Sequence, residues 1–167
     1  IDNPARRNPL TMGTFAEMRD ALARAKADDG VRVVVLTGAG EQAFSAGADL
    51  SSMAASAGHL ELHEARGELG RFIIDIWNLG KPTIAKVHGA AVAGGSDIAL
   101  SCDLLVMAED ARIGYMPTRV WGCPTTAMWT YRLGPTRAKQ LMFTGDTIDG
   151  LTAADWGLAN EAVPADQ

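Results

Sequence analysis

Residues 82–103 read PTIAKVHGAAVAGGSDIALSCD, in which a short apolar strand pattern leads through a bend rich in glycine and alanine into an apolar helix pattern. Residues 44–50, FSAGADL, form a second bend of similar composition. Small side chains let a ligand approach the main chain, and N–H groups at the start of a helix point outward with the positive end of the helix dipole behind them. Either bend alone is equally well explained as a tight turn in which glycine relieves strain. The pair together predicts a site where two main-chain amides hold one negatively charged oxygen.

Helix and strand patterns alternate on both sides of these bends. Over Met12–Ala27 apolar residues recur at three- and four-residue steps, which predicts an amphipathic helix. Residues 31–37 are β-branched and apolar, as is typical of a largely buried strand. We predict further strands at 82–87 and 104–107, and further helices at 51–78, 97–102, 125–133, 135–143 and 152–156. This alternation indicates a layered α/β fold.

The composition limits the possible classes of protein. With 167 residues, 47% of them hydrophobic, the chain can fill one core, so we expect a single domain over residues 1–167. A net charge of -5 argues against a nucleic-acid partner. Cys102 and Cys123 form neither a zinc pattern nor a disulfide framework, and no apolar stretch approaches the roughly 20 residues that span a bilayer. We therefore expect a cytoplasmic protein without a membrane partner.

The two bends are similar to the two oxyanion segments of the enoyl-CoA hydratase/isomerase (crotonase) superfamily. Residues 46–50 resemble the first segment and residues 87–103 the second, and the resemblance runs from Asn8-Pro9-Leu10 to Gly157-Leu158, nearly the whole chain. It implies the ClpP/crotonase fold, in which repeated ββα units form a spiral of roughly perpendicular sheets. Trimers, or pairs of trimers, are the usual assembly of that family. Its members are longer, so we expect that a C-terminal helical segment is truncated, and the turn-forming cluster after Ile1 suggests a trimmed N-terminus.

The same resemblance implies a role for individual residues. The oxyanion donors would be the backbone N–H groups of Ala48 and Gly94, each worth about 2.7–4 kcal/mol toward a developing oxyanion. An acyl-CoA thioester is the implied substrate; coenzyme A enters as part of it, and no separate cofactor or metal is expected. The residues expected to contact this substrate are Ala46, Asp49, Leu50, Pro117 and Trp121. Trp121 is equally well explained as a core residue.

Two glutamates activate water in the hydratases of the family, and the matching positions here hold Asp97 and Thr118. Asp97 keeps a carboxylate, although an acid near a helix N-terminus also simply favours the dipole. A threonine hydroxyl holds water but delivers no proton near neutral pH. The ligand class follows from the resemblance, whereas the reaction, hydration or isomerisation, stays open. Groups that could replace the second carboxylate are Tyr115, Arg119, Glu64 and Glu68.

Two other functions compete with this one. A non-catalytic acyl-CoA-binding homologue would keep the amide pair and lose the acid and base, and Thr118 favours it. A serine peptidase of the Clp type would use Ser96 and His88, but no nucleophile-elbow pattern surrounds Ser96.

Two further motifs are less specific than they look. His59 and His63 are four residues apart, but the glutamate of a zinc-protease helix does not follow the first histidine, so a solvated helix face is the better interpretation. Residues 89–96 lack both the lysine of a nucleotide-binding P-loop and the GxGxxG of a nicotinamide site.

Overall fold

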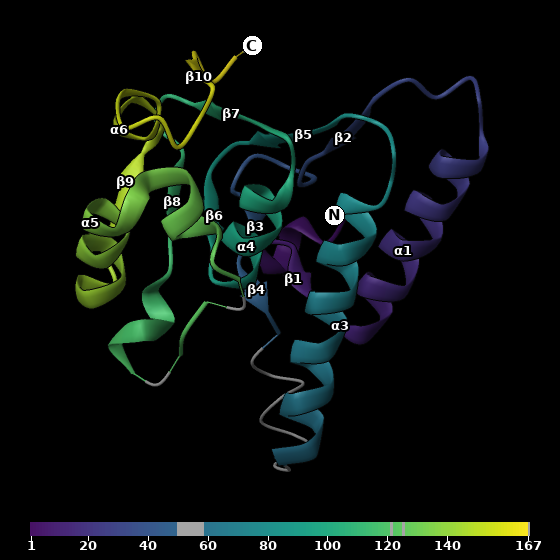
Figure 1. The fold of residues 1–167 in the computed structure, drawn as a ribbon, viewed down its shortest axis with the longest axis horizontal. Coiled ribbons are helices and arrows are strands. Elements are labelled where there is room, and N and C mark those ends of the chain that lie inside the picture. The colour runs from purple at the N-terminus through teal and green to yellow at the C-terminus, as the bar shows by residue number, and fades with distance from the viewer. Residues whose placement is uncertain (50–58, 121, 125, 167) are drawn as a thin grey trace.

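The computed structural model describes residues 1–49, 59–120, 122–124 and 126–166, with only the backbone described for 59–66 (Figure 1). Two four-stranded sheets form the centre of the molecule. The first has the strand order β10 (Glu161–Val163), β7 (Leu104–Ala108), β5 (Thr83–Val87), β2 (Val34–Leu36). The second has the order β3 (Ala43–Ser45), β6 (Ala90–Val92), β8 (Arg112–Gly114), β9 (Thr147–Asp149). A two-stranded sheet joins β1 (Pro9–Leu10) to β4 (Gly47–Ala48).

The chain builds the two sheets in turn. β2, β5 and β7 each add one strand to the first sheet, and the strands that follow them, β3, β6 and β8, add one to the second. Each of these pairs is followed by a long or buried helix: α3 (His59–Trp77), α4 (Gly94–Ser101) and α5 (Met128–Thr144). The strand order in both sheets thus follows the chain order. The predicted α/β fold of repeated ββα units is confirmed.

The helices cover the sheets and close the core. α1 (Met12–Ala27) has the predicted bounds, and the Thr11 side chain caps it by accepting the N–H of Thr14 at 3.1 Å. α1 packs along α3 through the tilted ring pair of Phe15 and Phe72, 6.1 Å between centroids (Figure 1). The short elements η1 (Pro4–Arg6), η2 (Met116–Arg119) and α6 (Gly150–Asp155) complete the described structure. Across the described residues, no helix has the length and apolar character needed to cross a bilayer.

The bounds of some predicted elements differ from the structure. The strand predicted at 31–37 is shorter and less buried than expected, because β2 lies at the end of its sheet and leaves the Val35 side chain 55% exposed. A β-branched run suits an edge strand as well as a central one, so the pattern could not distinguish the two. The two helices predicted at 125–133 and 135–143 are confirmed as separate segments of α5: Gly134 (φ 69°, ψ 169°) is non-helical and precedes Pro135, and the first segment begins at Met128.

A close approach of α4 to β3 joins the two bends identified in the sequence. A Cβ atom at Gly95 would lie 2.5 Å from the carbonyl oxygen of Ser45 and 2.9 Å from its Cβ. Such contacts cannot be relieved by turning a flexible side chain, because the oxygen belongs to the main chain of a buried strand. Glycine at position 95 is therefore what lets the helix lie against the strand.

The substitution Gly95→Ala should lower the free energy of unfolding by about 1–3 kcal/mol, because the added methyl group overpacks this contact. Gly70→Ala is the matched control: it is the same substitution within α3, where a Cβ would meet nothing within 4 Å. It should instead stabilise the protein by about 0.5–1 kcal/mol through helix propensity. Urea unfolding of the two variants measures both changes. Equal stability of Gly95→Ala and the parent would mean that α4 has room to shift.

Candidate functional site

The second bend lies between β6 and α4 and contains a strained residue. Ala93 has φ 53° and ψ -126°, a combination that L-residues seldom adopt, and it costs about 1–3 kcal/mol. Its N–H donates to the carbonyl of Gly114 (3.2 Å), and its own carbonyl accepts the N–H of Asp97 (3.2 Å). This turn starts α4 at Gly94 rather than at the predicted Asp97. The first N–H groups of the helix, beginning with Gly94, therefore point out of its end.

The first bend is held on both sides of Ala48. The N–H of Gly47 donates to the Ser45 hydroxyl oxygen (3.1 Å), and that hydroxyl donates to the Asn8 carbonyl (2.8 Å). On the other side, the N–H of Asp49 donates to the carbonyl of Leu10 in β1 (3.1 Å). Successive N–H groups along an extended strand point in opposite directions. The N–H of Ala48 therefore points away from β1, and Ala48 itself is exposed.

The two bends lie in direct contact. A Cβ at Gly47 (φ 83°) would lie 3.0 Å from the amide nitrogen of Gly94 and 2.8 Å from the Cβ of Ala93. The strands before the bends are also neighbours, with Ser45 opposite Ala91 in the parallel β3–β6 pair. Residues that are far apart in the sequence thus bring two main-chain segments to one place.

Asp97 lies in the first turn of α4 and is fully buried. It is three residues after Gly94, so both residues lie on the same face of the helix. The carboxylate thus stands one turn inside the helix whose N-terminus carries the Gly94 amide. The carbonyl of Asp97 accepts the hydroxyl of Ser101 (2.7 Å).

The other end of α4 is capped by an arginine from α5. The Arg132 guanidinium donates to the carbonyls of Leu100 (2.9 Å) and Cys102. A cation at this end satisfies helix carbonyls and is favoured by the dipole. Burial lowers the pKa of Arg132 and raises the pKa of the Cys102 thiol to about 12, so Cys102 stays a neutral core residue rather than a nucleophile.

Thr118 lies in η2 and has its hydroxyl proton engaged. The hydroxyl donates to the carbonyl of Tyr115 (3.0 Å), and Gly145 lies close enough that a Cβ there would be 3.0 Å from the same oxygen. Only the lone pairs of that oxygen remain to accept a hydrogen bond. Pro117, beside it in η2, is partly buried.

The groups that could replace the second carboxylate are engaged elsewhere. Glu68 bonds Arg19 of α1 and Arg71, and the nearby Arg71 lowers the pKa of the Glu68 carboxyl. Tyr115 donates its hydroxyl to the Cys123 carbonyl (2.9 Å). Arg119 donates to the Thr144 carbonyl and pairs with Asp146 (2.6 Å). The Glu64 side chain lies outside the described part of the chain.

The geometry around Ser96 does not resemble that of a peptidase. Its side chain is fully buried, and its hydroxyl donates to the Ala93 carbonyl at 2.6 Å. No hydrogen bond joins Ser96 to His88, both of which are among the described residues. The Ser96 side chain therefore forms a hydrogen bond within the first turn of α4.

Several predicted residues lie outside the described structure. Leu50 and Trp121 are among the undescribed residues, as are the side chains of His59 and His63. Among the residues that are described, no group of histidine, cysteine, aspartate and glutamate could hold a metal ion. Ala46 is described and partly buried, and its N–H donates to the carbonyl of Arg7 (3.0 Å).

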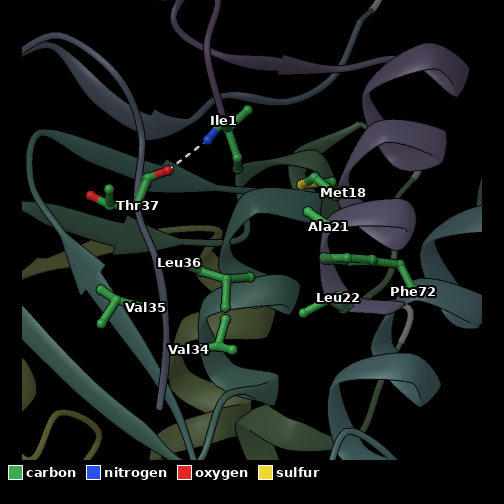
Figure 2. A pocket seen from close by; sticks show the side chains of 9 residues that line it. All are labelled: Ile1, Met18, Ala21, Leu22, Val34, Val35, Leu36, Thr37 and Phe72. Atoms are coloured by element: carbon green, nitrogen blue, oxygen red, sulfur yellow. Dashed lines mark hydrogen bonds between the residues drawn. The ribbon is translucent and has the colours of Figure 1, made fainter. Parts of the chain in front are cut away.

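An apolar cavity of about 280 Å³ lies elsewhere, between α1, α3 and β2 (Figure 2). Its lining consists of Ile1, Met18, Ala21, Leu22, Val34, Val35, Leu36, Thr37 and Phe72. Figure 2 shows the Val34 and Leu36 side chains on the side of β2 that faces Leu22 and Phe72, and the Val35 side chain on the other side. It also shows the Ile1 amino group donating to the Thr37 carbonyl (2.7 Å). None of the predicted site residues that the structure describes lines this cavity.

Sequence reasoning missed the polar residues that support the bends. Asn8 is fully buried; its side chain donates to the carbonyls of Ala39 (2.9 Å) and Ala43 (2.7 Å) and accepts the N–H of Asn3 (2.8 Å). Its φ is 54°, a value that asparagine tolerates better than most residues, so the residue type itself was the sequence signal for this turn. Arg6 pairs with the carboxylate of Asp49. Nothing in the sequence distinguishes Arg6 from its neighbour Arg7 for this role.

Comparison with known proteins identifies the family. The sequence model of the enoyl-CoA hydratase/isomerase family matches residues 1–167. A putative enoyl-CoA hydratase of Thermus thermophilus is 39% identical over 168 residues, which cover 98% of this chain and 66% of the relative. A crotonyl-CoA hydratase of Syntrophomonas wolfei is 34% identical over 174 residues, covering 100% of this chain and 65% of the relative.

Solved structures agree with the sequence relatives. The crystal structure of an enoyl-CoA hydratase from Bacillus anthracis superimposes with a TM-score of 0.94 at 32% identity, over 98% of this chain and 64% of that one. The chain thus spans about two thirds of the length of the relatives it matches. On its sequence and on its fold, this chain belongs to the enoyl-CoA hydratase/isomerase family.

Proposed function

We propose that this protein binds an acyl-CoA thioester and stabilises the enolate formed from it, with the N–H groups of Ala48 and Gly94 as the oxyanion hole. The observation that carries the proposal is the contact of the two bends, in which a Cβ atom at Gly47 would lie only 3.0 Å from the Gly94 nitrogen. The Ala48 N–H points away from β1, and the Gly94 N–H points out of the end of α4. Two fixed donors of this kind polarise a thioester carbonyl without reorganising during the reaction.

Hydration of an enoyl-CoA is the reaction we assign to the site. Water adds to the β-carbon of the unsaturated thioester, the electron pair moves onto the carbonyl oxygen, and the resulting enolate takes a proton at the α-carbon. Asp97 accepts the proton from water and returns it to the α-carbon, so one carboxylate serves both steps. Thr118 contributes an acceptor that orients the water. The Thermus thermophilus and Syntrophomonas wolfei relatives, described as hydratases, support this assignment.

The remaining substrate contacts follow from the family likeness. We assign Ala46 and Leu50 to the coenzyme A side of the site and Pro117 and Trp121 to the acyl side. Asp49, whose carboxylate is held by Arg6, supports the first bend instead of contacting the substrate. The proposal needs no cofactor beyond the coenzyme A of the substrate. We also propose that the protein assembles as a trimer or a pair of trimers and that it is located in the cytoplasm.

A non-catalytic acyl-CoA-binding protein is the second candidate, and the observation that favours it is Thr118. Its hydroxyl donates a hydrogen bond to the Tyr115 carbonyl, and a threonine at this position supplies no acid or base. Such a protein would bind the thioester through the same two amides. Turnover is what separates the two functions.

The protein should bind butyryl-CoA saturably and should hydrate crotonyl-CoA slowly. Because one of two acid–base groups is missing, we expect a rate about 10²–10⁴-fold below that of a two-carboxylate hydratase. Calorimetric titration measures binding, and loss of the enoyl thioester absorbance measures turnover. Binding without turnover would favour the second candidate, and absence of binding would contradict both.

Gly94→Pro should lower turnover by about 10²–10³-fold, because it deletes one oxyanion donor. Proline is tolerated at the first position of a helix, so α4 can keep its start. Gly94→Ala is the control: it retains the N–H, and its Cβ would meet only the side-chain ends of Leu10 (3.3 Å) and Leu69 (3.5 Å) within 3.5 Å. Circular dichroism checks folding of both variants. If two folded variants turn over equally, the Gly94 amide is not a donor.

Asp97→Asn should abolish most of the hydration, by about 10²–10⁴-fold, while the affinity for butyryl-CoA stays within about threefold of the parent. The amide has nearly the shape of the carboxylate but accepts no proton. Steady-state kinetics and titration measure the two effects separately. If Asp97→Asn turns over at the parent rate, Asp97 has no catalytic role and only interacts favourably with the dipole of α4.

A further inference from the structure

An ion pair adjoins the first bend at the residue after Ala48. The Asp49 carboxylate receives two hydrogen bonds from the Arg6 guanidinium, Nη1 to Oδ2 and Nη2 to Oδ1, both 2.9 Å. This is the forked geometry in which arginine binds a carboxylate most specifically. Asp49 is only 6% exposed, whereas Arg6, on η1 and 43 residues away in sequence, is 51% exposed.

We infer that Arg6 and Asp49 are a positioning pair that fixes the direction of the Ala48 N–H. The inference rests on the proposed function, in which that N–H is an oxyanion donor. Asp49 has both carboxylate oxygens engaged by Arg6 and is almost fully buried, so it acts through the main chain of its neighbour rather than on the substrate.

The short β4 strand explains why such a pair is needed. β4 has two residues and pairs only with β1 among the described strands, and a two-stranded ladder of this length is marginal. On the near side Gly47 is tied to the Ser45 hydroxyl. On the far side Asp49 is tied by its N–H to Leu10 and by its carboxylate to Arg6. With both neighbours held, the peptide plane that carries the Ala48 N–H cannot rotate freely.

Charge gives the pair a second effect. A carboxylate directly after an oxyanion donor would repel the negative charge that develops on the thioester oxygen. The guanidinium cancels that charge, and it also compensates the cost of burying the carboxylate. Removal of Arg6 therefore has two consequences: a loosened peptide plane and an uncompensated negative charge beside the site.

The test compares Arg6→Met with Arg19→Met. The control removes an arginine that bonds Asp75 at 2.6 Å and links α1 to α3, so it also loses an ion pair. The main readout is the carbonyl stretching frequency of bound butyryl-CoA, measured by Raman difference spectroscopy, which reports donor strength without turnover. Arg6→Met should move this band back toward that of the free thioester and lower kcat for crotonyl-CoA by about 10- to 10²-fold, with KM within about threefold. Arg19→Met should keep the parent band and kcat.

A rescue variant separates positioning from simple loss of stability. Asp49→Asn in the Arg6→Met background removes the buried charge, and it should restore kcat at least threefold over Arg6→Met alone. Arg6→Lys keeps the positive charge but not the forked contact, so the carbonyl band should lie between those of the parent and of Arg6→Met. If Arg6→Met does not fold, Arg6→Lys replaces it in the comparison.

The possible failures are distinct. A parent protein that leaves the carbonyl band unshifted would overturn the oxyanion hole itself. A parent that shifts the band, together with an Arg6→Met variant that shifts it equally, would overturn only the positioning pair. Absence of rescue by Asp49→Asn would overturn the charge effect of the pair.

Discussion

The structure depends on one close approach: the second bend lies against the first because neither carries a side chain at the point of contact. Gly47 faces the Gly94 nitrogen at a distance that no Cβ could share comfortably, and Gly95 faces the main chain of Ser45. The ββα topology makes this contact possible, since each unit delivers one bend beside the next. Both proposed donors, and the acid that follows one of them, are brought together by this packing.

Polar residues then restrict the movement of the two bends that the packing brings together. Asn8, Ser45 and the Arg6–Asp49 pair hold the first bend, and Arg132 holds the far end of α4. All of them bond to main-chain groups or to one another, and none needs to touch a substrate. The proposed site therefore consists of a few main-chain amides and one carboxylate, surrounded by side chains that restrict the movement of those groups.

Much of the fold and of the proposed site could be predicted from the sequence. There are physical reasons why the remainder could not. The bends, α1 and a layered α/β fold could be predicted, because small residues and apolar periods report directly on local geometry, whereas the repeated ββα units were implied by the family resemblance. The edge position of β2 could not, since the same β-branched residues suit edge and centre alike. Arg6 and Arg132 were missed because an arginine carries no local signal of the distant carbonyl or carboxylate that it will bind.

α4 is buried at all eight of its residues, Gly94 to Ser101. A helix enclosed in this way moves only when the surrounding core opens, and a close-packed core opens on the slow timescale of global unfolding. The N-terminus of α4, which carries one of the two proposed donors, is thereby static on faster timescales, so that any movement which admits a ligand to the proposed site falls to segments outside this helix. A ligand that docks against α4 would meet no reorganisation penalty from that side.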